Sequence, residues 1–304
     1  MTVCAAGINQ LRRPGRVSEK SIMVVTDTKF SWGDMSTEAG WKMQTIHPRW
    51  RVLFAGPLSP LDALMDAVRT EVANVRNISL RPFARLCSRA YRTERKNIIE
   101  TEILAEHDLD TYTEYQALKN SAIESDRVLF GLLGDKIKNE EQNWNLLFVG
   151  FDDTGRPHIF VITEFGKIQY CDTYGFAVIG SGCWPAQYTL GRFGFNKNLS
   201  RGEAAYALLA AKFAAESADG VGENTAFMML KADDRMGRTV SGLNTDDIAA
   251  IKAKWNGLAL IPSGAPQLLE ARIAQGEREP RIKIDNPLRG YLRRSMSRKL
   301  KRVR

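Results

Sequence analysis

The sequence predicts an α+β protein in which helices cover the outer faces of antiparallel sheets. Strand and helix patterns occur in blocks, in the order strands, helices, strands, helices, strand, and not in strict β–α–β alternation. The turn DDTGRP joins two strand patterns as in an antiparallel hairpin. With 304 residues, 44% of them hydrophobic, the chain can bury one large core or two small ones.

The first block contains four predicted strands, at 3–9, 21–30, 42–46 and 51–56. Val, Ile and Ala dominate the first two, which is typical of buried strands. From Leu61 to Val72, apolar residues then recur at the spacing of a helix. Ser59 followed by Pro60 fits an N-cap with proline at the first helical position.

A charged stretch with a mainly helical pattern, residues 80–142, separates the two strand blocks. Later strands are predicted at 144–151, 158–165, 168–172, 176–182 and 225–230. Helices are predicted from near Pro185, over 200–217 and over 244–255. Ser200 and Glu203 form a capping-box pattern at the start of the second of these helices.

The formal charge of +8 is concentrated at the C-terminus. Between Arg281 and Arg304 there are ten basic residues and one acidic residue, Asp285, so the other 280 residues sum to −1. Such a run is typical of a solvated, flexible chain end. The alternative is a segment that binds an acidic partner, nucleic acid or an anionic membrane surface.

Several classes of protein are disfavoured. No stretch has the length of a transmembrane helix, and no signal peptide is present, so we expect a cytoplasmic protein. The Cys and His residues form no zinc-site spacing, and we expect reduced thiols, no metal and no cofactor. Neither a P-loop nor a GxSxG serine-hydrolase motif occurs.

The N-terminal stretch MTVCAAGI places Thr2 directly behind the initiator methionine. Removal of Met1 would leave Thr2 with a free α-amine beside its own hydroxyl, which is a base and a nucleophile in one residue. The alternative is an ordinary residue at the start of the first strand. Cys4 is a weaker candidate nucleophile, because the amine would lie two residues away.

Further motifs follow Thr2 in a fixed order. Asp27 lies in VVTDTKF, Lys42 follows 15 residues later in KMQTI, and Gly56 follows 14 residues after that in FAGP. Downstream, GSG at 180–182 precedes a helix, and the helix containing AAYALLAAK ends in ESADGVG. Taken together, these motifs resemble β-type subunits of the proteasome, within the N-terminal-nucleophile hydrolases. The chain looks more similar to bacterial proteasome-like proteins that begin MTVC or MTIC than to the well-studied subunits.

The resemblance implies a four-layer αββα sandwich over residues 1–265, with the helical stretch 80–142 partly inserted into it. Residues 266–304 would form a C-terminal extension with the basic tail. Because no propeptide precedes Thr2, the resemblance implies that an aminopeptidase exposes Thr2 by removing Met1.

The resemblance also implies a role for each motif. Thr2 would attack the substrate carbonyl, and its amine would take the hydroxyl proton. The positive charge of Lys42 would favour loss of that proton, and Asp27 would keep Lys42 charged and oriented.

Four more residues would complete the site. The N–H of Gly56 would stabilise the oxyanion. Ser181, Glu216 and Asp219 would hold the terminal amine and its water. Glu216 departs from the family, which has the shorter Asp at this position.

Three functions follow from these observations. The first is a threonine peptidase or amidohydrolase that acts on peptides or proteins as a self-assembled ring or stack. The second is an inactive ring or scaffold subunit with the same fold. The third is a nucleic-acid or membrane binder that works through the basic tail. The sequence leaves open whether an ATP-dependent unfoldase is a partner.

Overall fold

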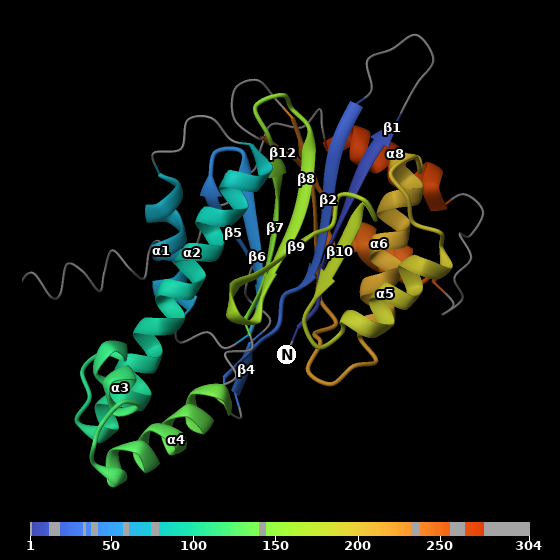
Figure 1. Cartoon of the computed structure of the whole chain (residues 1–304). Helices are drawn as coiled ribbons and strands as arrows, with labels where there is room; N and C mark the ends of the chain where they lie inside the picture. Colours follow the sequence, from blue (N-terminus) through green and yellow to red (C-terminus); the bar gives the residue numbers. More distant parts are fainter. Residues whose placement is uncertain are drawn as a thin grey trace, which may run out of the picture.

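The computed structural model describes residues 2–11, 19–32, 35–37, 42–56, 61–73, 79–139, 144–232, 238–255 and 265–276. Its mixture of helices and antiparallel strands confirms the α+β class (Figure 1). The predicted Ser59–Pro60 helix start and the basic tail after Arg281 lie outside these residues.

The first sheet has five strands, and every pair of neighbours is antiparallel. In spatial order the strands are β10 (Phe176–Ile179), β1 (Cys4–Leu11), β2 (Glu19–Asp27), β11 (Thr225–Lys231) and β12 (Arg238–Gly242). Cys4 at the start of β1 lies opposite both Thr26 near the end of β2 and Ile179 at the end of β10. The residues that precede Cys4, follow Thr26 and follow Ile179 therefore lie close together at one end of the sheet.

The second sheet also has five antiparallel strands. In spatial order they are β5 (Met43–His47), β6 (Trp50–Ala55), β7 (Asn145–Phe151), β8 (Pro157–Thr163) and β9 (Lys167–Tyr170). A 3₁₀ turn (Glu164–Gly166) joins β8 to β9. A separate small hairpin follows β2 and consists of β3 (Phe30–Trp32) and β4 (Met35–Thr37).

The two sheets pack face to face, and the alternation of side chains along β1 shows how. Cys4, Ala6 and Ile8 are buried together with residues of the second sheet, including Leu53 and Leu147. Ala5, and Val3 just before β1, point the other way and join a different core that contains the C-terminal helices. This period of two is expected for a strand that is buried on both faces.

Helices cover the outer face of each sheet (Figure 1). The first sheet is covered by α5 (Cys183–Arg192), α6 (Arg201–Ala215), α7 (Thr245–Lys252) and α8 (Ala265–Gly276). The second sheet is covered by α1 (Leu61–Val72) and α2 (Leu80–Ile98). The capping box of Ser200 and Glu203 is confirmed at the start of α6. In α8, Leu269 and Ile273 are buried in the same core as α6.

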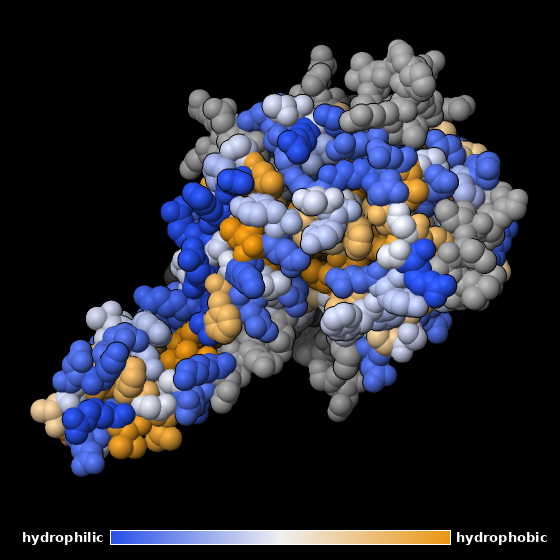
Figure 2. Space-filling model, turned by 45° about the vertical axis from the view of Figure 1, so that its right-hand side comes forward, coloured by the Kyte–Doolittle hydropathy of each residue, from blue (hydrophilic) through white to orange (hydrophobic). Residues whose placement is uncertain are grey.

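The helical stretch after α2 leaves the body of the molecule as an arm (Figure 1). It consists of a π-helical segment (Ile99–Leu104), a 3₁₀ turn (Ala105–His107), α3 (Tyr112–Leu118) and α4 (Glu124–Asn139). The arm has its own small core, which includes Leu104, Tyr115 and Leu133. Figure 2 shows hydrophobic side chains on its surface, and the exposed residues of the arm include Val128 and Leu132.

Several elements differ from the sequence-based expectation. β2 ends at Asp27 and not at residue 30, because its partner strand β11 begins opposite that residue at Thr225. The short strands β3, β4 and β12 were not expected, and neither was α8. Within the described ranges, no helix combines the length and apolar character needed to cross a membrane.

Candidate active site

The hydroxyl of Thr2 lies between a carboxylate and an ammonium group. Thr2 Oγ1 donates a hydrogen bond of 2.5 Å to Asp27 Oδ1 and accepts one from Lys42 Nζ. Lys42 Nζ also donates to Asp27 Oδ2 at 2.8 Å. All three side chains are buried, at 4% exposure or less. The structure thus brings together Thr2, Asp27 and Lys42, three residues that the sequence analysis had singled out.

The two sheets place these groups at the same end of the sandwich. Thr2 precedes β1, and Asp27 is the last residue of β2, where its N–H donates to Val3 O at 3.2 Å. Lys42 precedes β5 in the second sheet, and its carbonyl accepts a hydrogen bond of 3.2 Å from Phe54 N in β6. The ion pair between Asp27 and Lys42 therefore links the two sheets.

From the described residues, Asp27 accepts four hydrogen bonds. Besides those from Thr2 and Lys42, its carboxylate accepts one from Val3 N at 2.9 Å and one from Gly222 N at 3.2 Å. A buried carboxylate is costly unless it is paired and hydrogen-bonded. These partners offset that cost and hold both carboxylate oxygens in fixed positions.

The GSG segment at 180–182 holds the main chain of Thr2. Thr2 N donates to Ser181 Oγ at 3.1 Å, and Thr2 O accepts from Gly182 N at 3.2 Å. Gly180 has φ +97°, and a Cβ at this position would collide with the carbonyl of Thr2. Glycine is required here both for the backbone conformation and for the close approach.

Gly56 follows β6 directly and has φ +140°. Its neighbour Ala55 pairs with Asn145 in β7, so Gly56 lies at the same end of the second sheet as Lys42. Among the described residues, no group accepts a hydrogen bond from Gly56 N. This is the N–H to which the sequence analysis assigns oxyanion binding.

Among the described residues, neither Glu216 nor Asp219 makes a hydrogen bond to the Thr2 amine, so their role at the amine and its water stays a prediction. Both carboxylate oxygens of Glu216 bind lysines, Lys212 Nζ at 2.6 Å and Lys252 Nζ at 2.6 Å. Lys212 lies one turn earlier on the same helix, within easy reach of the long Glu side chain. Asp219 is exposed and makes no side-chain hydrogen bond or ion pair with any described residue.

Lys212 is a fully buried residue that the sequence analysis missed. Its Nζ donates to Glu216 and also to the carbonyl of Glu223 at 2.7 Å. Burial lowers the pKa of Lys212, against the opposing effect of Glu216. The signal in the sequence was a single lysine in the apolar run AAYALLAAKFAA. Because Gly222 next to Glu223 binds Asp27, Lys212 supports the loop that contacts the candidate site.

Replacing Lys212 by methionine is expected to lower the free energy of unfolding by about 1–3 kcal/mol, because the part-buried hydrogen bonds from its ammonium group to Glu216 and to the Glu223 carbonyl are lost. Glu216 keeps its pairing with Lys252, so no unpaired charge results. Urea denaturation measures the change, with the exposed Lys254→Met as the matched control. Equal stability of Lys212→Met and wild type would show that Lys212 does not hold this loop.

Cys4 is not suited to act as the nucleophile. Its side chain is fully buried, and this burial raises the pKa of the thiol to about 12, although the nearby charge of Lys42 opposes the effect. The thiolate, which is the reactive form of cysteine, is therefore scarce near neutral pH. In the described part of the chain, no cluster of three or more His, Cys, Asp or Glu residues is arranged to hold a metal ion.

Comparison with solved structures shows that the fold is proteasome-like. A solved structure of this class is similar, the Gly-1 mutant of Anbu from Hyphomicrobium sp. strain MC1. The TM-score is 0.57, the identity 15%, and the match covers 93% of this chain and 100% of that chain. At this identity the likeness concerns the fold alone. No protein-family profile and no curated protein sequence matches the chain.

Proposed function

We propose that the chain, once Met1 has been removed, is a hydrolase of peptide or related amide bonds in which Thr2 is the nucleophile. The observation that carries the proposal is the position of the Thr2 hydroxyl between Asp27 and Lys42, three groups from separate segments and two sheets. A positive charge next to a hydroxyl favours the alkoxide character that nucleophilic attack needs.

In the proposed reaction, Thr2 Oγ1 attacks the carbonyl carbon while its proton passes to the Thr2 α-amine. The C–N bond then breaks, and the leaving amine takes up that proton. Water hydrolyses the resulting ester and restores the threonine. Lys42 stabilises the negative charge on Oγ1, and Asp27 keeps Lys42 oriented. The N–H of Gly56 stabilises the oxyanion, and Ser181 positions the amine.

The proposal extends to the assembly. We infer that the two sheets and their covering helices form the αββα sandwich of N-terminal-nucleophile hydrolases, an inference that the proteasome-like fold supports. We therefore infer a self-assembled oligomer in the cytoplasm that acts on peptide or protein substrates. The oligomeric part is supported by the proteasome-like fold.

Covalent labelling tests the nucleophile. Purified protein is incubated with a peptide β-lactone, and the adduct is mapped by mass spectrometry. We expect one adduct, on Thr2, that is absent from Thr2→Ala and retained in Thr2→Ser. If protein that starts at Thr2 gives no adduct, or an adduct on another residue, the proposal fails. The inactive scaffold would then be the better interpretation.

A further inference from the structure

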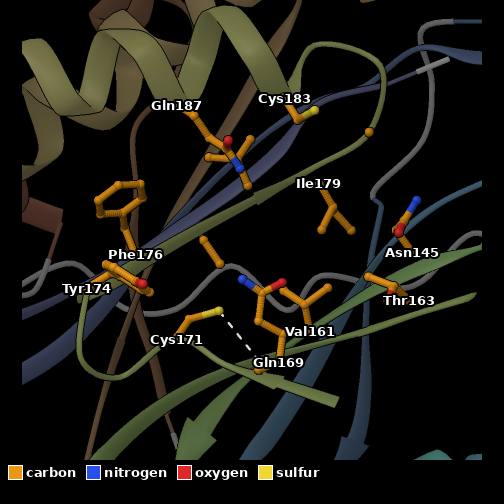
Figure 3. A pocket seen from close by; sticks show the side chains of 13 residues that line it. Asn145, Val161, Thr163, Gln169, Cys171, Tyr174, Phe176, Ile179, Cys183 and Gln187 are labelled. Carbon is orange, nitrogen blue, oxygen red and sulfur yellow. Dashed lines mark hydrogen bonds between the residues drawn. The ribbon is translucent and has the colours of Figure 1, made fainter. Parts of the chain in front are cut away.

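A cavity of 360 Å³ lies along β10, between the β8–β9 hairpin and the start of α5 (Figure 3). We call it the β10 groove. One end is formed by Gly180, whose Cα faces the Thr2 carbonyl, and by Asn145, which pairs with Ala55 next to Gly56. The other end is formed by Tyr174 and Phe176. The groove therefore begins beside the candidate active site.

The wall of the β10 groove is the free edge of a sheet. Among the strands that the structure describes, β10 pairs only with β1, and residues 176–179 all line the groove. Ile8 N donates to Gly175 O at 2.7 Å, and hydrogen-bonded positions alternate along an antiparallel pair. The backbone groups of Phe176 and Val178 therefore point away from β1. Within the described ranges, none of these N–H and C=O groups has a backbone partner.

The side chains around the groove are neutral. All thirteen described residues that line it are uncharged. Three of them carry side-chain amides, Asn145, Gln169 and Gln187, and Figure 3 shows that they come from three different elements. None of these amides makes a hydrogen bond to another described residue. Burying a charged group here would leave it without an opposite charge, whereas amides match the donors and acceptors of a peptide.

We propose that an extended, uncharged peptide segment binds in the β10 groove as an added antiparallel or parallel strand on β10. Phe176 and Val178 would supply the main-chain hydrogen bonds, as in other cases where a peptide adds a strand to a sheet edge. This inference rests on the proposed function in one respect. The bound segment is taken to be a part of the substrate that lies away from the bond that is cut. Unfolded polypeptide with a neutral stretch is then the preferred substrate.

Binding is measured in Thr2→Ala, which cannot turn the probe over. The probe is a fluorescent, N-acetylated heptapeptide amide of Ala, Val, Gln and Thr. Cys183 lines the groove and is half-buried, whereas the other three cysteines are buried, so iodoacetamide alkylation of Cys183 reports on occupancy. We expect saturable binding and at least tenfold slower alkylation of Cys183 when the peptide is present.

Two changes test the main-chain contact. Two further probes carry N-methyl groups on alternate amides, one on the odd-numbered and one on the even-numbered residues. One of the two is expected to bind at least tenfold more weakly than the unmodified probe, because it loses the N–H groups that face β10. Val178→Pro removes a groove-facing N–H that β1 does not use, and it should weaken the unmodified probe similarly. Val178→Ala keeps the N–H and serves as the matched control, with affinity close to that of the parent.

Several results would overturn the proposal: no binding of the probe, equal binding of all N-methylated probes, or full affinity in a folded Val178→Pro variant. A dimer that dissociates in Val178→Pro would instead assign the edge to a second copy of the chain. Should Val178→Pro fail to fold, the N-methylated probes still decide. Because the assay uses a variant without the nucleophile, failure of the hydrolase proposal leaves its result standing.

Discussion

Asp27→Asn is expected to lower peptide turnover about a thousandfold while the protein still folds. The asparagine has the same size, but it cannot neutralise Lys42. Its amide group would also face donors, because one carboxylate oxygen binds Val3 N and the other binds Gly222 N. Lys42 and the Thr2 hydroxyl would then lose the partner that fixes their mutual position.

Steady-state hydrolysis of a fluorogenic peptide measures this effect, and circular dichroism checks the fold. The matched control is Asp62→Asn, which changes an exposed carboxylate in the first turn of α1. We expect Asp62→Asn to keep wild-type turnover. Turnover of Asp27→Asn within about twofold of wild type would remove Asp27 from the mechanism.

Lys42→Met is expected to lower the free energy of unfolding by about 3–5 kcal/mol, the range found when one partner of a buried ion pair is removed. Methionine fills much of the same volume, but Asp27 would keep a buried charge at 0% exposure without its cation. Activity should be lost as well, because Thr2 Oγ1 would lose its positively charged neighbour.

Combining Lys42→Met with Asp27→Asn separates charge from packing. The double variant has no buried charge at this position, so we expect it to be more stable than Lys42→Met alone in guanidinium denaturation. A double-mutant cycle gives the coupling between the two residues. Strictly additive losses of stability would show that the ion pair is not what makes Lys42→Met unstable.

Much of the fold could be predicted from the sequence because local patterns determine it. The alternation in β1 and β2, the helical spacing from Leu61 to Val72 and the Ser200–Glu203 capping box all act over a few residues. The grouping of strands and helices then disfavoured a parallel sheet. β12 and α8 could not be predicted because β12 is short and α8 is weakly periodic. β12 forms by pairing with the preceding strand β11, and α8 is stabilised by packing against the distant helix α6.

The candidate site, too, could be predicted from the sequence only in part. Thr2, Asp27 and Lys42 lie at strand ends or next to strands, so their spacing along the chain reflected a real meeting point in space. Glu216 could not be placed from its position alone, because its partners Lys212 and Lys252 come from two helices. Spacing along the chain can identify residues that lie near strand ends. It cannot show which of several possible partners a side chain such as Glu216 will bind, because tertiary packing decides that.

The most direct test of the central claim is the N-terminus of the active protein, determined by intact mass together with N-terminal sequencing. The proposed mechanism requires a chain that begins at Thr2 with a free α-amine, and that is the result we expect for protein that hydrolyses peptides. Hydrolytically active protein that retains Met1, or whose Thr2 amine is acetylated, would contradict an N-terminal threonine nucleophile.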